Sequence, residues 1–116
     1  LDVRDAATMG ATIANGGRNP RTGEQVIDSV MCHDVMAVMA TAGLYETSGD
    51  WLWDVGLPGK SGISGVIVAL SPGKGAMAAF SPLLDDAGNS IRGQIAAKLL
   101  SQELGLDVFA ARPSSG

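Results

Sequence analysis

The feature that most constrains the fold is an apolar run followed by a tight turn. Residues 63–70 are apolar at nearly every position, which is typical of a central strand covered on both faces. The next three residues, Ser71-Pro72-Gly73, have turn chemistry, and residues 75–80 have the length of a returning strand. This spacing predicts an antiparallel hairpin. Residues 51–55 alternate bulky and small side chains and are predicted to form a third strand.

Three further segments have the apolar spacing of helices, at residues 5–14, 28–42 and 90–104. Asp28 or Ser29 is predicted to cap the second helix. Its predicted buried face consists of Met31, Val35, Val38, Met39 and Ala42, and Gly43 ends it. Asn89 or Ser90 is predicted to cap the last helix. That helix carries an apolar stripe of Ile91, Ile95, Leu99, Leu100 and Leu104 before Gly105.

These elements predict an α/β chain of the α+β type, an antiparallel sheet with packed helices over residues 1–109. Residues 110–116 are predicted to be a flexible tail. The first two helices either cover the second face of the sheet or belong to a separate helical lobe. The opening Leu-Asp-Val-Arg-Asp is typical of the middle of a protein, so a partner segment is expected.

Composition excludes several classes of function. The 8 basic and 12 acidic residues give a net charge of −4 without a basic stripe, so no nucleic-acid partner is expected. The longest strongly apolar run, residues 66–70, is too short to cross a membrane, and no membrane partner is expected. Cys32 is the only cysteine, which excludes an intrachain disulfide and favours a cytoplasmic location. No cofactor or metal is expected.

The triplet Lys60-Ser61-Gly62 precedes the apolar strand, and a Lys-Ser/Thr-Gly triplet occurs in penicillin-recognising serine hydrolases. Its lysine provides a positive charge, its serine a hydroxyl donor, and its glycine a close approach to the backbone. Ile63, which follows, can direct its backbone N–H at a developing oxyanion. An ordinary Gly/Ser loop is the alternative. A phosphate-binding loop is excluded because Asp54 stands where that motif needs glycine.

Two other candidates, the Ser71–Lys74 pair and His33, are weaker than Tyr45. Ser71 and Lys74 have the Ser-x-x-Lys spacing of a nucleophile and its base, but the intervening Pro and Gly predict a turn instead of the helix this chemistry needs. His33 lies between a cysteine and an aspartate, and consecutive helical side chains cannot converge on one atom. Tyr45, in a loop just before the triplet, could relay a proton or could simply anchor the loop.

Short blocks along residues 2–109 resemble, in order, the bacterial and mitochondrial glutaminase family. The blocks are Ala11-Thr12-Ile13-Ala14-Asn15-Gly16-Gly17, Asn19-Pro20, Thr22-Gly23-Glu24, Ala42-Gly43-Leu44-Tyr45, Ser48-Gly49, Val55-Gly56-Leu57-Pro58, Lys60-Ser61-Gly62, Ser81-Pro82, Leu84-Asp85 and Gly88-Asn89-Ser90 with Gly93. Each block is short, and their occurrence in this order is specific. The chain departs from the family pattern at Gly59 (usually alanine), Ile63 (valine), Ser64 (glycine) and Leu83 (proline), and Trp51 and Trp53 are bulkier than usual.

The resemblance implies a serine β-lactamase-like fold and hydrolysis of L-glutamine to L-glutamate and ammonia through a glutamyl-serine intermediate. It implies that the nucleophilic serine and its lysine lie on an upstream helix, so this chain alone is expected to be inactive. The implied partners are the missing N-terminal half of the enzyme and further copies in a homo-oligomer.

The resemblance also assigns roles to residues of this chain. Tyr45 matches a tyrosine that contacts substrate and shuttles a proton. Ile63 matches the residue whose backbone N–H completes the oxyanion hole, so both positions bind substrate. Lys60 and Ser61 match the strand-edge motif that supports the site. Two rivals remain: another penicillin-recognising hydrolase acting on β-lactams or esters, and a non-catalytic assembly module.

Overall fold

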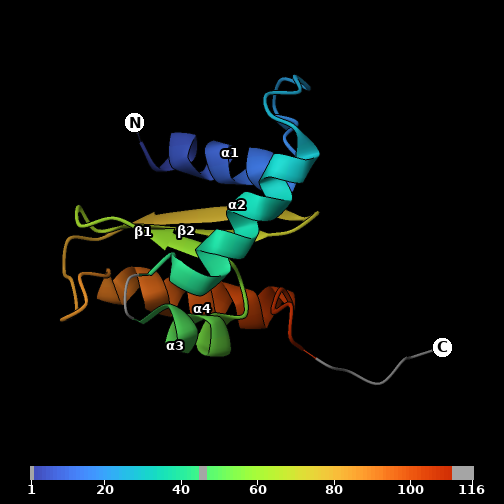
Figure 1. The fold of residues 1–116 in the computed structure, drawn as a ribbon. Helices are drawn as coiled ribbons and strands as arrows, with labels where there is room; N and C mark the ends of the chain where they lie inside the picture. Colours follow the sequence, from blue (N-terminus) through green and yellow to red (C-terminus); the bar gives the residue numbers. More distant parts are fainter. Residues whose placement is uncertain (1, 45–46, 111–116) are drawn as a thin grey trace.

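The computed structural model describes residues 2–44 and 47–110 (Figure 1). Seven elements follow one another along the chain: α1 (Val3–Ala14), α2 (Ser29–Ala42), α3 (Ser48–Val55), β1 (Gly59–Ser61), β2 (Val66–Ser71), β3 (Gly75–Phe80) and α4 (Ile91–Leu104). No helix among the described residues is long and apolar enough to span a bilayer.

The three strands form one antiparallel sheet in the order β1-β2-β3. The predicted hairpin is confirmed: β2 pairs with β3, and the turn between them closes through a 2.9 Å hydrogen bond from the Lys74 amide to the Ser71 carbonyl. The predicted strand 63–70 is shorter than expected. It begins at Val66, because residues 62–65 turn the chain between β1 and β2, with a 3.0 Å bond from the Gly62 amide to the Val66 carbonyl.

Helices cover both faces of the sheet (Figure 1). α1 lies over β2 and β3, where Gly10 permits close approach because a Cβ there would lie 2.8 Å from Val68 Cγ1. α4 lies on the opposite face, with α3 beside it, and α2 passes the β1 edge and contacts both α1 and α3. The main core fills the α3–α4 side and consists of Leu44, Trp51, Val55, Leu57, Ile67, Ala69 and Ala97.

The prediction of a strand at residues 51–55 is wrong, because this segment is the larger part of α3. A five-residue segment with apolar groups at positions 51, 53 and 55 is too short to distinguish the two-residue period of a strand from the 3.6-residue period of a helix. Trp51 and Val55 also have the i, i+4 spacing of a helix. The two tryptophans therefore point in different directions instead of sharing a strand face. Trp51 is 3% exposed in the core, whereas Trp53 is 84% exposed.

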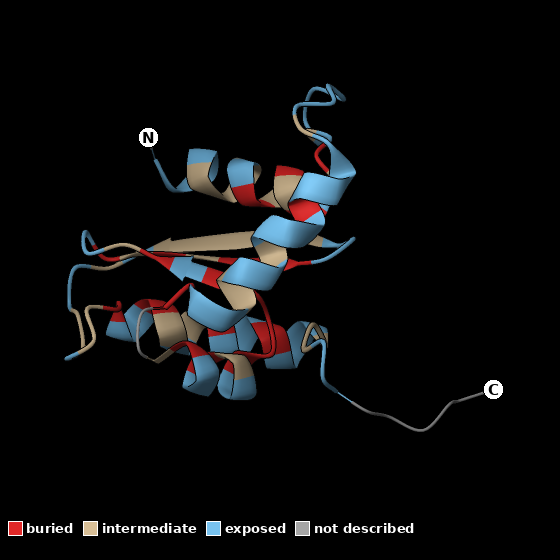
Figure 2. Ribbon diagram, in the orientation of Figure 1, coloured by how far each residue is buried: buried red, intermediate tan, exposed pale blue. Residues whose placement is uncertain are grey.

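The buried face predicted for the second helix is wrong, and the apolar stripe of the last helix is not the side that packs on the sheet. α4 packs on the sheet through its small residues Gly93, Ala97 and Ser101, and its large apolar stripe faces outward. In α2 only Cys32 is buried, and most of the helix surface is exposed (Figure 2). Helices that lie close to a sheet need small side chains at the contact, so the larger side chains are left on the outer faces.

The helix ends agree better with the sequence. Asp28 caps α2 by accepting a 3.0 Å bond from the Val30 amide, and Ser90 caps α4 by accepting from the Gly93 amide at 3.1 Å. Gly105 follows α4 in the left-handed conformation, with φ 64°. Of the predicted tail only Ala110 is described, and residues 111–116 lie outside the described part of the chain.

Candidate functional site

Strand β1 places the two side chains of the Lys-Ser-Gly motif on opposite faces of the sheet. Gly59 and Ser61 are buried on one face, and Lys60 is exposed on the other. This alternation is the ordinary consequence of a strand's two-residue period. Lys60 Nζ donates to its neighbour's main-chain carbonyl, that of Ser61. The motif therefore presents its cation and its hydroxyl to different surroundings.

The Lys60 side of the sheet carries an open apolar groove. Its volume is about 750 Å³, and α1, α2, β2 and β3 form its walls. Lys60 and Ser64 line one end together with Val66 and Phe80. Phe80 is exposed although it is a large aromatic residue at the end of a strand. Lys60 is thus the cation at an otherwise largely apolar surface.

Ile63 lies in the turn that joins β1 to β2, next to Ser64 of the groove wall. Its side chain is 77% exposed. Among the described residues, its backbone N–H has no hydrogen-bond acceptor, whereas the neighbouring Gly62 and Gly65 amides are both bonded within the turn at 3.0 Å. Sheet pairing therefore leaves the Ile63 amide available to an external oxygen.

The Ser61 hydroxyl, by contrast, belongs to a buried network. It donates to Asn89 Oδ1, and the Asn89 Nδ2 group donates to the Leu44 carbonyl at 3.1 Å and to Thr47 Oγ1 at 2.8 Å. The Ser61 amide donates to the Gly43 carbonyl at 3.1 Å. A serine hydroxyl has one proton, and this one is already donated inside the protein. Ser61 therefore supports the site through this buried network of hydrogen bonds.

Asn89 is the residue that sequence reasoning missed. It was predicted only as a possible cap of the last helix, a role that Ser90 performs. The side chain of Asn89 is completely buried, at 0% exposed. The sequence signal for Asn89 was its place in the Gly88-Asn89-Ser90 block. That signal does not distinguish a helix cap from a buried bridging residue, because both roles use the same residue types.

The loop that carries Asn89 is fixed by Asp85. One oxygen of its carboxylate accepts from the amides of Ala87 and Asn89, both at 3.0 Å, and the other from Gln94 Nε2 at 3.0 Å. The Gln94 hydrogen bond, assisted by those backbone amides, holds the pKa of Asp85 below its ordinary value, although partial burial opposes this. The carboxylate therefore favours its charged form.

Tyr45, the proposed proton shuttle, lies outside the described residues. Its flanking residues are described: Leu44 is fully buried, and Thr47 is half-buried. The Leu44 amide donates to Ser48 Oγ at 2.9 Å, and Thr47 Oγ1 donates to the Leu44 carbonyl at 3.0 Å. Both residues also bond to Asn89, so the chain is fixed on either side of positions 45 and 46.

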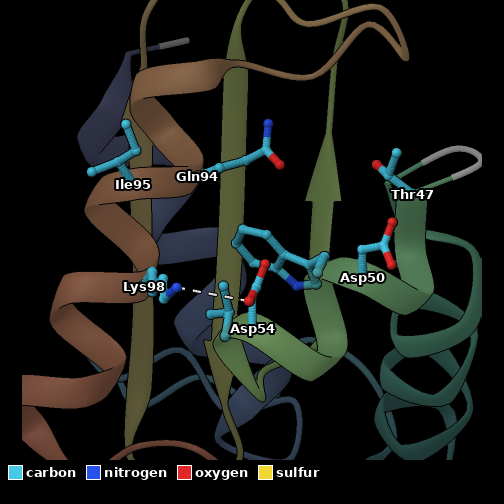
Figure 3. A pocket seen from close by; sticks show the side chains of 8 residues that line it. Thr47, Asp50, Asp54, Gln94, Ile95 and Lys98 are labelled. Carbon is cyan, nitrogen blue, oxygen red and sulfur yellow. Dashed lines mark ion pairs between the residues drawn. The ribbon is translucent and has the colours of Figure 1, made fainter.

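A smaller pocket, lined by both apolar and charged side chains, lies between α3 and α4 (Figure 3). It has a volume of about 350 Å³ and contains the ion pair between Lys98 Nζ and Asp54 Oδ1, at 3.7 Å. None of Lys60, Ser61 and Ile63 lines it. Exposed ion pairs of this kind contribute little, so we assign no chemistry to this pocket.

The two weaker candidates from the sequence are the Ser71–Lys74 pair and His33, and they lie in other surroundings. Ser71 and Lys74 sit in the β2–β3 turn, as predicted. His33 pairs with its exposed neighbour Asp34, at 3.2 Å, and Cys32 is buried. Within residues 2–44 and 47–110, no three His, Cys, Asp or Glu side chains are grouped as metal ligands would be.

Comparison with known proteins places these features in a family. Residues 1–109 match the family model described as Glutaminase. Similar curated proteins include Glutaminase 2 of Yersinia pestis, 63% identical over 113 residues, which are 97% of this chain and 33% of that protein. The glutaminase of Desulfovibrio desulfuricans is 52% identical over 111 residues, 96% of this chain and 36% of that protein. The chain thus spans about a third of the length of these relatives.

Solved structures agree. A probable glutaminase, ybaS, superposes with a TM-score of 0.93 and 47% identity, over 96% of this chain and 36% of that one. The Bacillus subtilis glutaminase YbgJ, in covalent complex with 5-oxo-L-norleucine, superposes with a TM-score of 0.89 and 35% identity, over 94% of this chain and 40% of that one. The predicted fold class, an antiparallel sheet with packed helices of the serine β-lactamase-like type, is confirmed.

Proposed function

The chain belongs to the glutaminase family, and we propose that it forms the sheet side of an active site that hydrolyses L-glutamine to L-glutamate and ammonia. The observation that carries this proposal is the Ile63 backbone N–H, which has no acceptor among the described residues and lies beside the groove that Lys60 lines. Family membership gives the substrate, and the available amide gives a chemical role to this chain.

In the proposed reaction a serine attacks the side-chain amide carbon of glutamine, and the carbonyl oxygen becomes an oxyanion. The Ile63 N–H donates to that oxyanion, and one such donor stabilises the transition state by about 2.7–4 kcal/mol. Tyr45 transfers the serine proton toward the departing ammonia. Water then hydrolyses the glutamyl-serine ester. Lys60 and Ser61 support the site, Lys60 as a cation at the groove and Ser61 through the buried network.

The nucleophile in this proposal comes from a segment outside the matched third of the family. The apolar groove between α1, α2 and the sheet fits that assignment, because an exposed apolar surface of this size favours a protein partner. We propose that the N-terminal part of the enzyme covers it. The covalent complex of the Bacillus subtilis relative supports a nucleophile in the family, since 5-oxo-L-norleucine has the carbon skeleton of glutamine with one further carbon.

Assembly and location complete the proposal. The outward Ile and Leu stripe of α4 supports a homo-oligomer, because such stripes are usually covered by protein. The single buried cysteine, Cys32, supports a cytoplasmic location. Gel filtration with light scattering would test the first, and fractionation of cells that express the protein would test the second.

A chimera tests the proposed function directly. The matching third of the Yersinia pestis relative is replaced by this chain, and ammonia release from L-glutamine is measured. The unsubstituted chimera is expected to be active. Ile63→Pro deletes the N–H and should lower kcat by about 100-fold or more, whereas Ile63→Val keeps it and should retain activity. Tyr45→Phe should lower kcat with the fold preserved.

The same chimera separates the rivals. Hydrolysis of nitrocefin without hydrolysis of glutamine would favour another penicillin-recognising hydrolase. Full glutamine turnover by Ile63→Pro would contradict the role of this amide. The 116-residue chain alone should release no ammonia, and a chain that does would show that the nucleophile lies within it.

A further inference from the structure

We propose that Asn89 is a positioning residue of this site: its buried amide holds the backbone on both sides of positions 45 and 46 against strand β1. The proposal deepens the proposed function and rests on it. Asn89 lies in the loop before α4, and the hydrogen bonds of its side chain go to Ser61, Leu44 and Thr47. It would therefore act only through the residues that it holds.

The amide of Asn89 has a single sensible orientation. The Leu44 carbonyl can only accept a hydrogen bond, so the group that faces it, at 3.1 Å, must be the NH₂. The second proton of that NH₂ goes to Thr47 Oγ1 at 2.8 Å. The amide oxygen then faces the Ser61 hydroxyl, which donates to it. The bonds to Ser61 and Leu44 are buried, where a displaced partner has no water to replace it, and the bond to Thr47 is partly buried.

These three bonds join segments that are far apart in the sequence. Ser61 is the last residue of β1, and β1 pairs with β2 along one of its two edges. At the other edge the Ser61 amide donates to the Gly43 carbonyl, and Asn89 adds the side-chain connection to Leu44 and Thr47. The Ile63 amide follows Ser61 by two residues. Asn89 therefore fixes Leu44 and Thr47 relative to the strand that leads directly to the proposed oxyanion donor.

The Asn89 side chain is itself held in place. Its main-chain amide donates to Asp85 Oδ1 at 3.0 Å, and its carbonyl accepts from the Asp85 amide at 2.8 Å. Catalytic groups must be placed within about 0.5 Å of the productive geometry, and such supporting bonds provide that accuracy. If Asn89 served stability alone, its substitution would lower the free energy of unfolding but would not change kcat relative to KM.

The experiment compares two buried polar side chains in the chimera described above. Asn89→Ala removes the bridge, and Ser101→Ala removes a bond of similar burial, from Ser101 Oγ to the Val55 carbonyl at 2.6 Å, on the far side of the core. Both should lower the melting temperature. Asn89→Ala should also lower kcat on the order of 10- to 100-fold and change its pH profile, because small displacements of catalytic groups have effects of this size. Ser101→Ala should leave kcat and the profile unchanged.

A milder variant covers the case in which Asn89→Ala fails to fold. Thr47→Val removes one acceptor of the Asn89 amide and also the bond from the Thr47 hydroxyl to the Leu44 carbonyl. It should lower kcat about fivefold, within the range expected for the loss of one or two hydrogen bonds. If Asn89→Ala and Thr47→Val lose stability but keep kcat and its pH profile, as Ser101→Ala does, the positioning role is refuted while the glutaminase assignment stands. If the unsubstituted chimera is inactive, or Ile63→Pro has no effect, the proposed function itself is refuted.

Discussion

The indole of Trp51 lies directly against the backbone of Gly59, so that a Cβ at position 59 would be 2.7 Å from Nε1 and 2.8 Å from Cε2. The indole N–H also donates to the Leu57 carbonyl at 2.7 Å. The resemblance to the family pattern implies an alanine at position 59 and a smaller residue at position 51. The contact makes these two departures one structural change, in which the glycine provides room for the larger ring at the start of β1.

This contact predicts strong coupling between the two positions. Gly59→Ala should destabilise the chain by about 1–3 kcal/mol, because the methyl group has no room beside the indole. In a Trp51→Leu background the same substitution should cost clearly less, since the ring atoms that it would meet are gone. Urea unfolding of the two single variants and the double variant gives the coupling energy. Equal costs in both backgrounds would contradict the coupling.

The sequence predicted the hairpin well because its signals are local: an apolar run, a Ser-Pro-Gly turn and a second run of matching length. It did not predict α3, since residues 51–55 fit both periods and only the tertiary contact of Trp51 with the core favours the helix. It identified the apolar stripe of α4 but not the small residues, Gly93, Ala97 and Ser101, through which that helix packs. Which face of a helix meets the sheet depends on how closely the two approach.

A second prediction concerns the approach of α2 to β1. A Cβ on Gly43 would lie 1.7 Å from the Gly59 carbonyl oxygen, although the φ of Gly43, −72°, is ordinary. Gly43→Ala should therefore separate the segments, break the bond from the Ser61 amide, and cost about 3 kcal/mol or more. The matched control is Gly49→Ala on α3, where nothing lies within 4 Å of the new methyl group. That variant should be neutral or more stable by up to about 1 kcal/mol.

Thermal and urea unfolding of both glycine variants would check this, and hydrogen exchange of the Ser61 amide adds a local reading. In Gly43→Ala that amide should exchange faster than in the parent chain. A stable Gly43→Ala with an unchanged Ser61 amide would show that the segments do not meet as closely as described.

The orientation of α4 gives a third prediction. Ala97 is completely buried against the sheet, so Ala97→Leu should overpack the core and cost about 1–3 kcal/mol. Leu99 lies on the outer face, so Leu99→Gln should change the free energy of unfolding by no more than about 0.5 kcal/mol. If the apolar stripe were the buried face of α4, the ranking of the two variants would be reversed. Urea unfolding of the two variants distinguishes the two orientations.

The candidate site was predictable in part. Motif spacing identified Lys60, Ser61 and Ile63 as neighbours in the chain, and an alternating strand then places the first two on opposite faces. The bond between Ser61 and Asn89 could not be predicted, because it joins residues 28 positions apart through a loop whose path depends on the whole fold. Such contacts are set by tertiary packing and leave only a short polar block in the sequence.

The loop before α4 provides a pH-dependent prediction. The Gln94 hydrogen bond and the backbone amides lower the pKa of Asp85 in the folded chain below its ordinary 3.8. The charged carboxylate therefore stabilises the fold fully above pH 3.8, and this contribution is lost as the pH falls through the lowered folded-state pKa. Asp85→Asn should be less stable than the parent by about 1 kcal/mol near neutral pH, since partial exposure weakens these charge-assisted bonds.

The gap between the parent chain and Asp85→Asn should close as the solution becomes more acidic than pH 3.8, because protonated Asp85 loses the same interactions as asparagine. Urea unfolding of both chains across this range measures the gap, and Asp86→Asn, an exposed neighbour, controls for the change in net charge. A gap that stays constant or widens on acidification would show that Asp85 acts through shape alone. A stability difference that shrinks on acidification would show that the negative charge of Asp85 holds the Asn89 amide in place.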